Sequence, residues 1–496
     1  MLRTSVDPGT ASDFACTGQA IHDFLVEAIT VGAAMTQARA AVAEAWAAVA
    51  DNPMGVTMPR LDRAGLGPFE AVRGLTFDAP FPQLIPVRQI FDAPHLDDVA
   101  GATERALEPL RSRVRDGMSV AITAGSRGIH DKAEVVRAAG QWLRSAGAEP
   151  FVVPAMGSHG GATADGQVQL LADLGMTQET LGMPIRATME TVELDRLPDG
   201  PAVHLDAHAA KADAILVVNR VKAHTDFKGE IESGLAKIVA IGLGKQKGAE
   251  GIHRYGPANL GVWIPQMARR IVETGKILGG LAIIENAYDR AAQIELVGAE
   301  DIGGPVEAEL LVKAKHLMAT LPFDVVDVAV IDVMGKNMSG TGMDTNVIGR
   351  MMIRGSAEFD RPRITNIAVL DVSGASHGNA IGLGLADFVP FRILEKLDLR
   401  SMYINAMTSG LGGPQRGQLP MAMPSDRSTV AAAILTCGRA LLHEISLVRM
   451  HNTLELEHLL VSESLRDQVL ADPSLEITGD ALPMLFDDDG RMQPWE

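Results

Sequence analysis

Short apolar runs rich in Val, Ile and Leu alternate with segments of helical periodicity from about residue 81 onward. Near-continuous β-branched runs indicate strands buried on both faces, and their alternation with helices is typical of α/β folds with parallel sheets. The pattern predicts strands at 118–124, 150–154, 214–219, 281–285, 325–333 and 364–372. It predicts helices at 132–146, 163–174, 306–319 and 428–448.

The same pattern divides the chain into an extension and two domains. Residues 1–80 are expected to form an N-terminal helical extension, because 25–50 is Ala-rich and interrupted by polar residues at helical spacing. Residues 81–270 are expected to form the first α/β domain. A fresh series of strands and helices then predicts a second α/β domain at 271–496.

Composition and charge exclude several classes of protein. The chain has 496 residues and a net charge of −18, which argues against nucleic-acid and anionic-membrane partners. Its two cysteines, Cys16 and Cys437, lie too far apart in sequence to suggest a metal or redox motif, and a disulfide scaffold is excluded. We find no apolar segment of about 20 residues that would span a membrane. We therefore expect a cytoplasmic location.

A glycine-rich loop, GSRG at 125–128, directly follows a predicted strand. In open α/β sheets, ligands bind beyond the carboxyl ends of the strands. The backbone N–H groups, the Ser126 hydroxyl and the Arg127 guanidinium could together hold a phosphate or carboxylate. A tight turn with a solvated arginine is the alternative.

A second glycine-rich loop, GSHGG at 157–161, follows the next predicted strand. Gly157 and Ser158 precede His159, which has two further glycines after it. A histidine among glycines has little packing around it, so we expect its imidazole to face a ligand. A structural histidine is the alternative.

The segment 220–254 is basic within an acidic chain: it has seven Lys or Arg residues against four acidic ones. Most of its lysines fit a solvated surface. Lys237 differs, because it precedes the apolar run IVAIGLG, where desolvation would make its amine a nucleophile or a covalent anchor. His224 and His253 flank it.

Two further loops carry a lysine beside glycines. GLGK at 242–245 is not a Walker loop, because Val239 and Gln246 occupy positions that require Gly and Ser or Thr. The loop at 335–344, GKNMSGTGMD, follows a buried strand and carries Lys336. It is expected to contact the substrate, and a plain connection is the alternative.

These residues include three histidines, a lysine at an apolar edge and an anion loop, with no hydrolytic triad. Two imidazoles on opposite sides of a small anion would suit proton transfer at both faces of a stereocentre, as a racemase requires.

Four motifs together resemble the nickel-dependent lactate racemase superfamily, whose members racemise or epimerise 2-hydroxyacids. The resemblance covers about residues 80–420. Its motifs are GSRGI (125–129), PAMGSHGGAT (154–163), SGLAK (233–237) with His253, and GKNMSGTGMD (335–344). It implies two α/β domains with the site in the cleft between them. It also implies a nickel-pincer nucleotide, a pyridinium-3-thioamide-5-thiocarboxylate mononucleotide, as cofactor.

The resemblance also implies individual roles. Lys237 would attach the cofactor covalently, and His253 would complete the nickel coordination. His159 and His224 would act as proton relays while a hydride moves between the substrate Cα and the cofactor. The other implied contacts to cofactor or substrate are Ser126, Arg127, Gly157, Ser158 and Lys336.

Differences from the lactate enzymes around Arg127 favour a 2-hydroxyacid other than lactate as the substrate. Two alternative functions stay open. One is a nucleotide-using or cofactor-free enzyme that keeps the anion loops. The other is a non-catalytic protein that binds anions or regulates.

Overall fold

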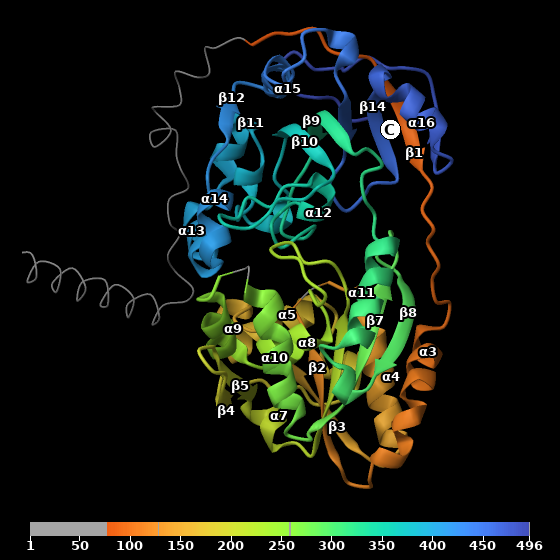
Figure 1. Ribbon diagram of the computed structural model, residues 1–496, viewed down its shortest axis with the longest axis vertical. Helices are drawn as coiled ribbons and strands as arrows, with labels where there is room; N and C mark the ends of the chain where they lie inside the picture. Colours follow the sequence, from red (N-terminus) through yellow and green to blue (C-terminus); the bar gives the residue numbers. More distant parts are fainter. Residues whose placement is uncertain (1–76, 127, 257–258, 496) are drawn as a thin grey trace, which may run out of the picture. The chain divides into compact units, whose positions relative to one another are not determined.

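The computed structural model of the protein describes residues 77–495 except 127, 257 and 258 (Figure 1). Most of the expected N-terminal extension, together with Cys16 and Arg127, lies outside the described residues. The described chain contains two large sheets, each with several parallel strands, and a small two-stranded sheet. Helices alternate with the parallel strands, so the predicted α/β class is confirmed.

The first large sheet has five strands, of which the first four are parallel and the last is antiparallel. In sheet order they are β3 (Glu149–Pro154), β2 (Ser119–Ala124), β6 (Ala214–Arg220), β7 (Ile277–Glu285) and β8 (Ala291–Val297). On β6, Ile215 and Val217 point into one hydrophobic core, and Leu216 and Val218 point into the core on the opposite face. Burial on both faces explains the unbroken apolar run that predicted this strand.

Helices cover both faces of this sheet (Figure 1). The helices α10 and α11 contribute to one core, and α3 and α4 to the other. The helices of this part of the chain are α3 (Val99–Leu107), α4 (Lys132–Ser145), α5 (Ala164–Asp173), α6 (Gln178–Leu181), α7 (Ala207–Lys211), α8 (Leu235–Lys237), α9 (Lys245–His253), α10 (Leu260–Val272) and α11 (Pro305–Leu317). The two-stranded sheet pairs β4 (Thr191–Arg196) with β5 (Ala202–Asp206).

The second large sheet has eight strands, five of them parallel. In sheet order they are β12 (Met421–Met423), β11 (Phe388–Pro390), β10 (Arg363–Val369), β9 (Val325–Ile331), β13 (Leu447–Met450), β14 (His458–Ser462), β1 (Leu84–Gln89) and β15 (Leu475–Ile477). Its helices are α12 (Thr345–Ile348), α13 (Leu399–Thr408), α14 (Gly413–Arg416), α15 (Asp426–Leu435) and α16 (Arg466–Ala471).

The structure differs from the sequence-based prediction at one helix and in the extent of both domains. The helix expected at 428–448 ends at Leu435, because Gly438 adopts a left-handed φ of +84° and the apolar residues from Leu447 pair as β13 with β9 and β14. The expected boundary at 270 falls before β7 and β8, which belong to the first sheet because α10 returns the chain to a position beside β6. Similarly, β1 belongs to the second sheet, where it pairs with β14 and β15.

Candidate functional site

The parallel strands β2, β3 and β6 end at one edge of the five-stranded sheet, so the loops that follow them are neighbours. The backbone N–H of Gly157 donates to the carbonyl of Gly242 at 3.2 Å. A Cβ on Gly125 would lie 3.3 Å from Cδ1 of Ile238. Ile238 and Gly242 bound the π-helical turn that follows Lys237. The predicted loops 125–128 and 157–161 therefore meet the lysine-bearing segment.

A buried carboxylate fixes the short helix α8, which ends at Lys237. Glu307 on α11 accepts hydrogen bonds from the backbone N–H of Ala236, at 3.1 and 3.2 Å, and from that of Gly303, at 2.8 Å. Burial raises the pKa of Glu307, and these N–H donors act in the opposite direction. A Cβ on Gly234 would lie 2.1 Å from the Glu307 carboxylate, so the backbone approaches this closely only because residue 234 is glycine.

The amine of Lys237 contacts the imidazole of His224. The distance from Lys237 Nζ to His224 Nε2 is 2.6 Å. On the other side of the ring, Nδ1 of His224 accepts the backbone N–H of Asp226 at 2.9 Å. The ring also packs on Phe227, with ring centroids 4.4 Å apart. Burial, reinforced by Lys237, lowers the pKa of His224 well below its usual value, so the ring is neutral.

This arrangement determines where the protons lie. Since Nδ1 of the neutral His224 ring accepts a hydrogen bond, the ring proton is on Nε2. Nε2 faces the Lys237 nitrogen, 2.6 Å away.

His253 is the last residue of α9 and is half-buried. Burial lowers its pKa; the charge of Lys237 adds to this effect, and Asp226 opposes it. Lys237 also lowers the pKa of His224 and Asp226 also raises it, and His253 lowers it further. His253 therefore lies within electrostatic range of Lys237 and His224, and burial favours its neutral ring.

The other end of α9 is anchored by a buried ion pair. Lys245 Nζ lies 3.1 Å from a carboxylate oxygen of Asp206 and donates to the side-chain oxygen of Gln167 at 3.0 Å. Gln167 in turn donates to the carbonyl of Gly157 at 2.9 Å. Lys245 is fully buried and already paired, which agrees with the rejection of a phosphate loop at 242–245.

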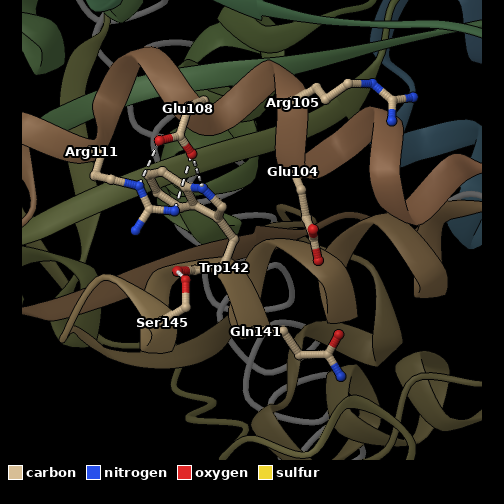
Figure 2. Close-up of a pocket in the computed structure, with 7 residues that line it drawn as sticks. All are labelled: Glu104, Arg105, Glu108, Arg111, Gln141, Trp142 and Ser145. Carbon is tan, nitrogen blue, oxygen red and sulfur yellow. Dashed lines mark hydrogen bonds and ion pairs between the residues drawn. The ribbon is translucent and has the colours of Figure 1, made fainter.

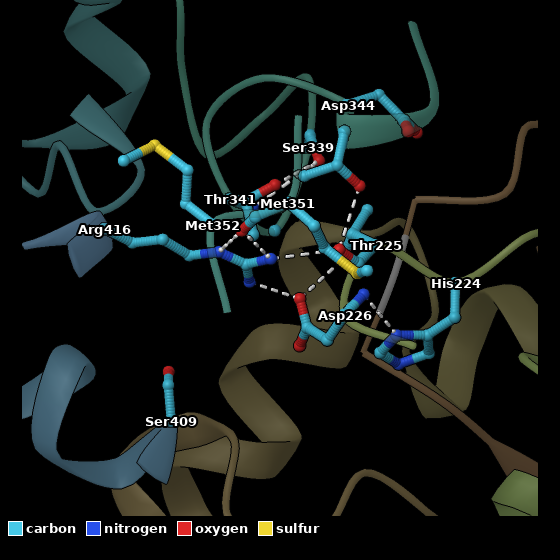
Figure 3. Close-up of polar contacts among 12 residues, drawn as sticks. His224, Thr225, Asp226, Ser339, Thr341, Asp344, Met351, Met352, Ser409 and Arg416 are labelled. Atoms are coloured by element: carbon cyan, nitrogen blue, oxygen red, sulfur yellow. Dashed lines mark hydrogen bonds and ion pairs between the residues drawn. The ribbon is translucent and has the colours of Figure 1, made fainter. Parts of the chain in front are cut away.

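A buried arginine from α14 holds the loop that carries His224 (Figure 3). The guanidinium of Arg416 pairs with the carboxylate of Asp226 and donates to the carbonyl of Thr225 at 3.0 Å. It also donates twice to the carbonyl of Met351, at 3.1 and 3.0 Å. Burial alone would raise the pKa of Asp226, but Arg416 holds it well below its usual value. Asp226 is therefore a carboxylate whose backbone N–H orients the imidazole.

Further contacts join this loop to Asp344, the last residue of the predicted loop 335–344, and to α12, which follows it. Burial would raise the pKa of Asp344, but Lys222 beside it lowers that pKa. The contacting pairs are Lys222 with Asp344 (3.5 Å), the Thr345 hydroxyl with the Thr225 carbonyl (2.9 Å), and Lys228 with Asn346. Residues that follow β9 of the eight-stranded sheet thus help to position the His224 loop.

Lys336 lies at the other end of that loop. Its amine donates to the carbonyl of Gly340 at 2.6 Å and to the side-chain oxygen of Asn405 at 2.8 Å. Its backbone N–H donates to the hydroxyl of Ser376 at 2.9 Å. All three partners belong to segments of the eight-stranded sheet, so these contacts place Lys336 on that side of the molecule.

His159 is exposed on the loop 157–161. Its backbone N–H donates to the carbonyl of Met156 at 3.1 Å, and its carbonyl accepts from Gln167 at 3.3 Å. Ser158 is also exposed, and Ser126 is half-buried. The structure therefore brings the backbone of this loop to the Lys237 segment and leaves the His159 side chain accessible.

Sequence reasoning missed four residues that shape the site. Asp226, Arg416 and Glu307 act on His224 or Lys237 through the contacts above. The fourth, Lys132, is buried and donates to the carbonyl of Gly125 at 2.8 Å, and burial lowers its pKa to about 7. Only Asp226, two residues after His224, had a local signal.

A separate cavity of about 550 Å³ lies between α4 and the 3-10 helix Glu108–Arg113 (Figure 2). The indole N–H of Trp142 donates to Glu108 at 3.1 Å. Arg111 pairs with the same carboxylate at 2.7 and 3.0 Å and stacks 5.1 Å from the indole ring. These polar groups satisfy one another, and the lining residues that the structure describes include none of the predicted site. We therefore place the candidate site at the sheet edge around Lys237.

Within the described residues, no group of three or more His, Cys, Asp or Glu side chains is arranged to hold a metal ion. Nor does any helix in that part of the chain combine the length and apolar character needed to cross a bilayer.

By class, the described chain is an α/β protein with a lysine–histidine cluster at the edge of a parallel sheet. Among solved structures it resembles the lactate racemase apoprotein from Thermoanaerobacterium thermosaccharolyticum, with 10% sequence identity and a TM-score of 0.40. The alignment covers 75% of this chain and 88% of that chain. No protein family and no curated protein matches the sequence. This likeness is distant, and it does not identify the reaction.

Proposed function

We propose that the protein is a racemase or epimerase of a 2-hydroxyacid and uses a nickel-pincer nucleotide attached at Lys237. The observation that carries the proposal is the 2.6 Å contact between Lys237 and His224, with His253 within electrostatic range of both. The sequence motifs suggested these three residues from separate positions along the chain. Their convergence supports a shared role.

The residues fit the proposed cofactor. A pincer nucleotide brings its own sulfur and carbon donors, so nickel needs a single protein nitrogen, which the neutral ring of His253 offers. A cluster of several protein ligands is therefore not required. Lys237 would react as its amine, the form that can make an amide-type bond, and its nitrogen already lies against His224. When bound, the cofactor supplies a hydride acceptor, which avoids a carbanion beside the substrate carboxylate.

Attachment of the cofactor would change what His224 Nε2 contacts. Nε2 lies 2.6 Å from the Lys237 nitrogen. An amide-type nitrogen at Lys237 would offer no lone pair to Nε2, which would then be available to the substrate. His224 then serves as one proton relay at the substrate hydroxyl, and the accessible His159 serves as the other.

We assign the substrate carboxylate to Arg127, with Lys336 on the side of the eight-stranded sheet. Ser126, Gly157 and Ser158 would contact the nucleotide. Arg and Lys side chains are the usual partners of a carboxylate, and the loop glycine lets backbone N–H groups approach an anion.

Preparation of the protein in cells that make the cofactor tests the proposal. We expect intact mass to show an adduct on Lys237, elemental analysis to show about one nickel per chain, and chiral chromatography to show exchange of 2-hydroxyacid enantiomers. Lys237→Ala should abolish all three. The matched control Lys247→Ala removes an exposed lysine of the next helix and should abolish none.

Two outcomes would favour the alternative functions. A nucleotide bound without nickel and with unmodified Lys237 would indicate a different enzyme class. Stoichiometric binding of a 2-hydroxyacid by nickel-loaded protein, without stereochemical exchange, would indicate a binding protein.

A further inference from the structure

A second cavity, of about 420 Å³, lies where the connection after β1, the β7–β8 turn, the β13–β14 loop and the C-terminal segment meet. Its volume falls within the range of about 300–1,000 Å³ typical of small-molecule sites. Phe91, Tyr288 and Trp495 line it. The chain has only 13 Phe, 4 Trp and 3 Tyr among 496 residues, so three aromatic rings around one cavity are a marked concentration.

The charged residues around this cavity are acidic. Asp289, Glu455 and Glu457 line it, and the lining residues that the structure describes include neither lysine nor arginine. Glu455 makes no ion pair with any other described residue. The lining therefore combines aromatic rings with three carboxylates.

Arginines from outside the lining already approach these groups. The Arg449 guanidinium carbon lies 5.9 Å from the centre of the Trp495 ring. Arg88 pairs with Glu457 at 2.8 Å, and Arg220 lies 3.6 Å from Asp289. These cations already engage Trp495, Glu457 and Asp289. Glu455 is left without a cation, and the Phe91 and Tyr288 rings meet edge to face with centroids 5.9 Å apart.

We propose that this cavity binds an organic cation, a quaternary or protonated amine, between its aromatic rings and Glu455. Aromatic faces attract cations through their quadrupole, and a nearby carboxylate adds direct charge attraction. Tyr288 follows β7 of the five-stranded sheet, and Glu455 precedes β14 of the eight-stranded sheet. A bound cation would thus contact segments of both sheets. The site is separate from the one that contains Lys237.

Calorimetric titration of the full chain with choline tests this proposal. Its uncharged isostere, 3,3-dimethylbutan-1-ol, has the same shape. We expect choline to bind with one site per chain, and the alcohol to bind at least about tenfold more weakly, since it lacks the charge that the rings and Glu455 attract. Tryptophan fluorescence should change on choline binding, because Trp495 lines the cavity.

Two cavity variants and one control locate the site. Glu455→Gln should weaken choline binding by about three- to tenfold and leave the alcohol nearly unaffected. Tyr288→Leu should weaken choline binding as well. Glu104→Gln, in the cavity beside Trp142, should change nothing.

Three results would overturn the proposal. The first is no choline binding by the unaltered chain at concentrations of about 10 mM, well above the affinities of specific sites. The second is equal affinity for choline and the alcohol. The third is choline binding that survives both cavity substitutions.

Discussion

Replacement of Arg416 by methionine removes the guanidinium that holds the His224 loop. Arg416 is only 2% exposed and donates to Asp226, Thr225 and Met351. Methionine keeps much of the apolar volume and removes every donor. The substitution leaves the Asp226 carboxylate without its counter-charge and removes the Arg416 donors from the carbonyl of Met351, while the carbonyl of Thr225 keeps the Thr345 hydroxyl.

The magnitude follows from the burial of the pair. Removing one member of a buried ion pair costs roughly 3–5 kcal/mol, because the other charge stays buried. The side chain of Asp226 keeps 29% exposure, so water screens part of this penalty. We therefore expect Arg416→Met to lower the free energy of unfolding by about 3 kcal/mol near pH 7.5.

The cost should depend on pH. In the native protein the pKa of Asp226 lies below its unfolded value, so the pair stabilises the fold above about pH 4 and loses that effect as the pH falls further. In Arg416→Met, burial without the counter-charge raises that pKa above its unfolded value. Protonation then relieves the penalty as the pH falls, so the cost should shrink to roughly 1 kcal/mol at pH 4.5.

Equilibrium urea unfolding, followed by circular dichroism at pH 7.5 and 4.5, measures both effects. Asp226→Asn and the double variant complete a mutant cycle, with an expected coupling energy of about 2–3 kcal/mol at pH 7.5. Arg361→Met is the control: its pair with Asp324, at 3.3 Å, is exposed and should contribute less than about 1 kcal/mol. A coupling energy below about 0.5 kcal/mol, or a cost that does not change with pH, would refute the reasoning.

Three further substitutions test the surroundings of the site. Gly242→Ala should destabilise the protein by about 1–3 kcal/mol in thermal unfolding, because the added Cβ would lie 2.6 Å from the Ala155 carbonyl oxygen. In the control Gly251→Ala the added Cβ meets nothing closer than 3.9 Å, so that substitution should be neutral or stabilising. The Lys132→Met variant should be more stable than the native chain at pH 7, because the native pKa of Lys132 is about 7 and its unfolded pKa is about 10.4. That advantage in the free energy of unfolding should fall as the pH rises to 10. A difference in stability that stays constant with pH would contradict this prediction. Glu307→Ala should cost about 1–3 kcal/mol in urea unfolding, because it leaves buried N–H groups without an acceptor; an unchanged midpoint would show that water replaces the carboxylate.

Local sequence pattern predicted much of the fold, because burial on both faces leaves a direct trace in a strand. The β6 residues Ile215 to Val218 alternate between two cores, so all of them are apolar. The predicted helix at 428–448 was wrong beyond Leu435, because the apolar β13 residues have no local feature that distinguishes them from a helix. Pairing of β13 with β9 is a long-range property, and periodicity does not report it.

The candidate site shows the same division. Lys237 was predicted from the apolar run beside it and His224 from the family resemblance, and the structure places their nitrogens 2.6 Å apart. Arg416 and Glu307 were missed because each acts through contacts far along the chain, 190 residues from Asp226 and 71 from Ala236. The sequence around Arg416 has no feature that marks it as the partner of a buried carboxylate.

These missed residues position the predicted ones. Sequence names a lysine and a histidine, but not how the two side chains are held against each other. Nδ1 of His224 accepts the N–H of Asp226, and Nε2 faces the Lys237 nitrogen. Asp226 presents that N–H because Arg416 fixes its carboxylate and the carbonyl before it. The contact between His224 and Lys237 thus depends on an arginine of α14, so residues from both sheets, and not the motif alone, define the geometry around the lysine.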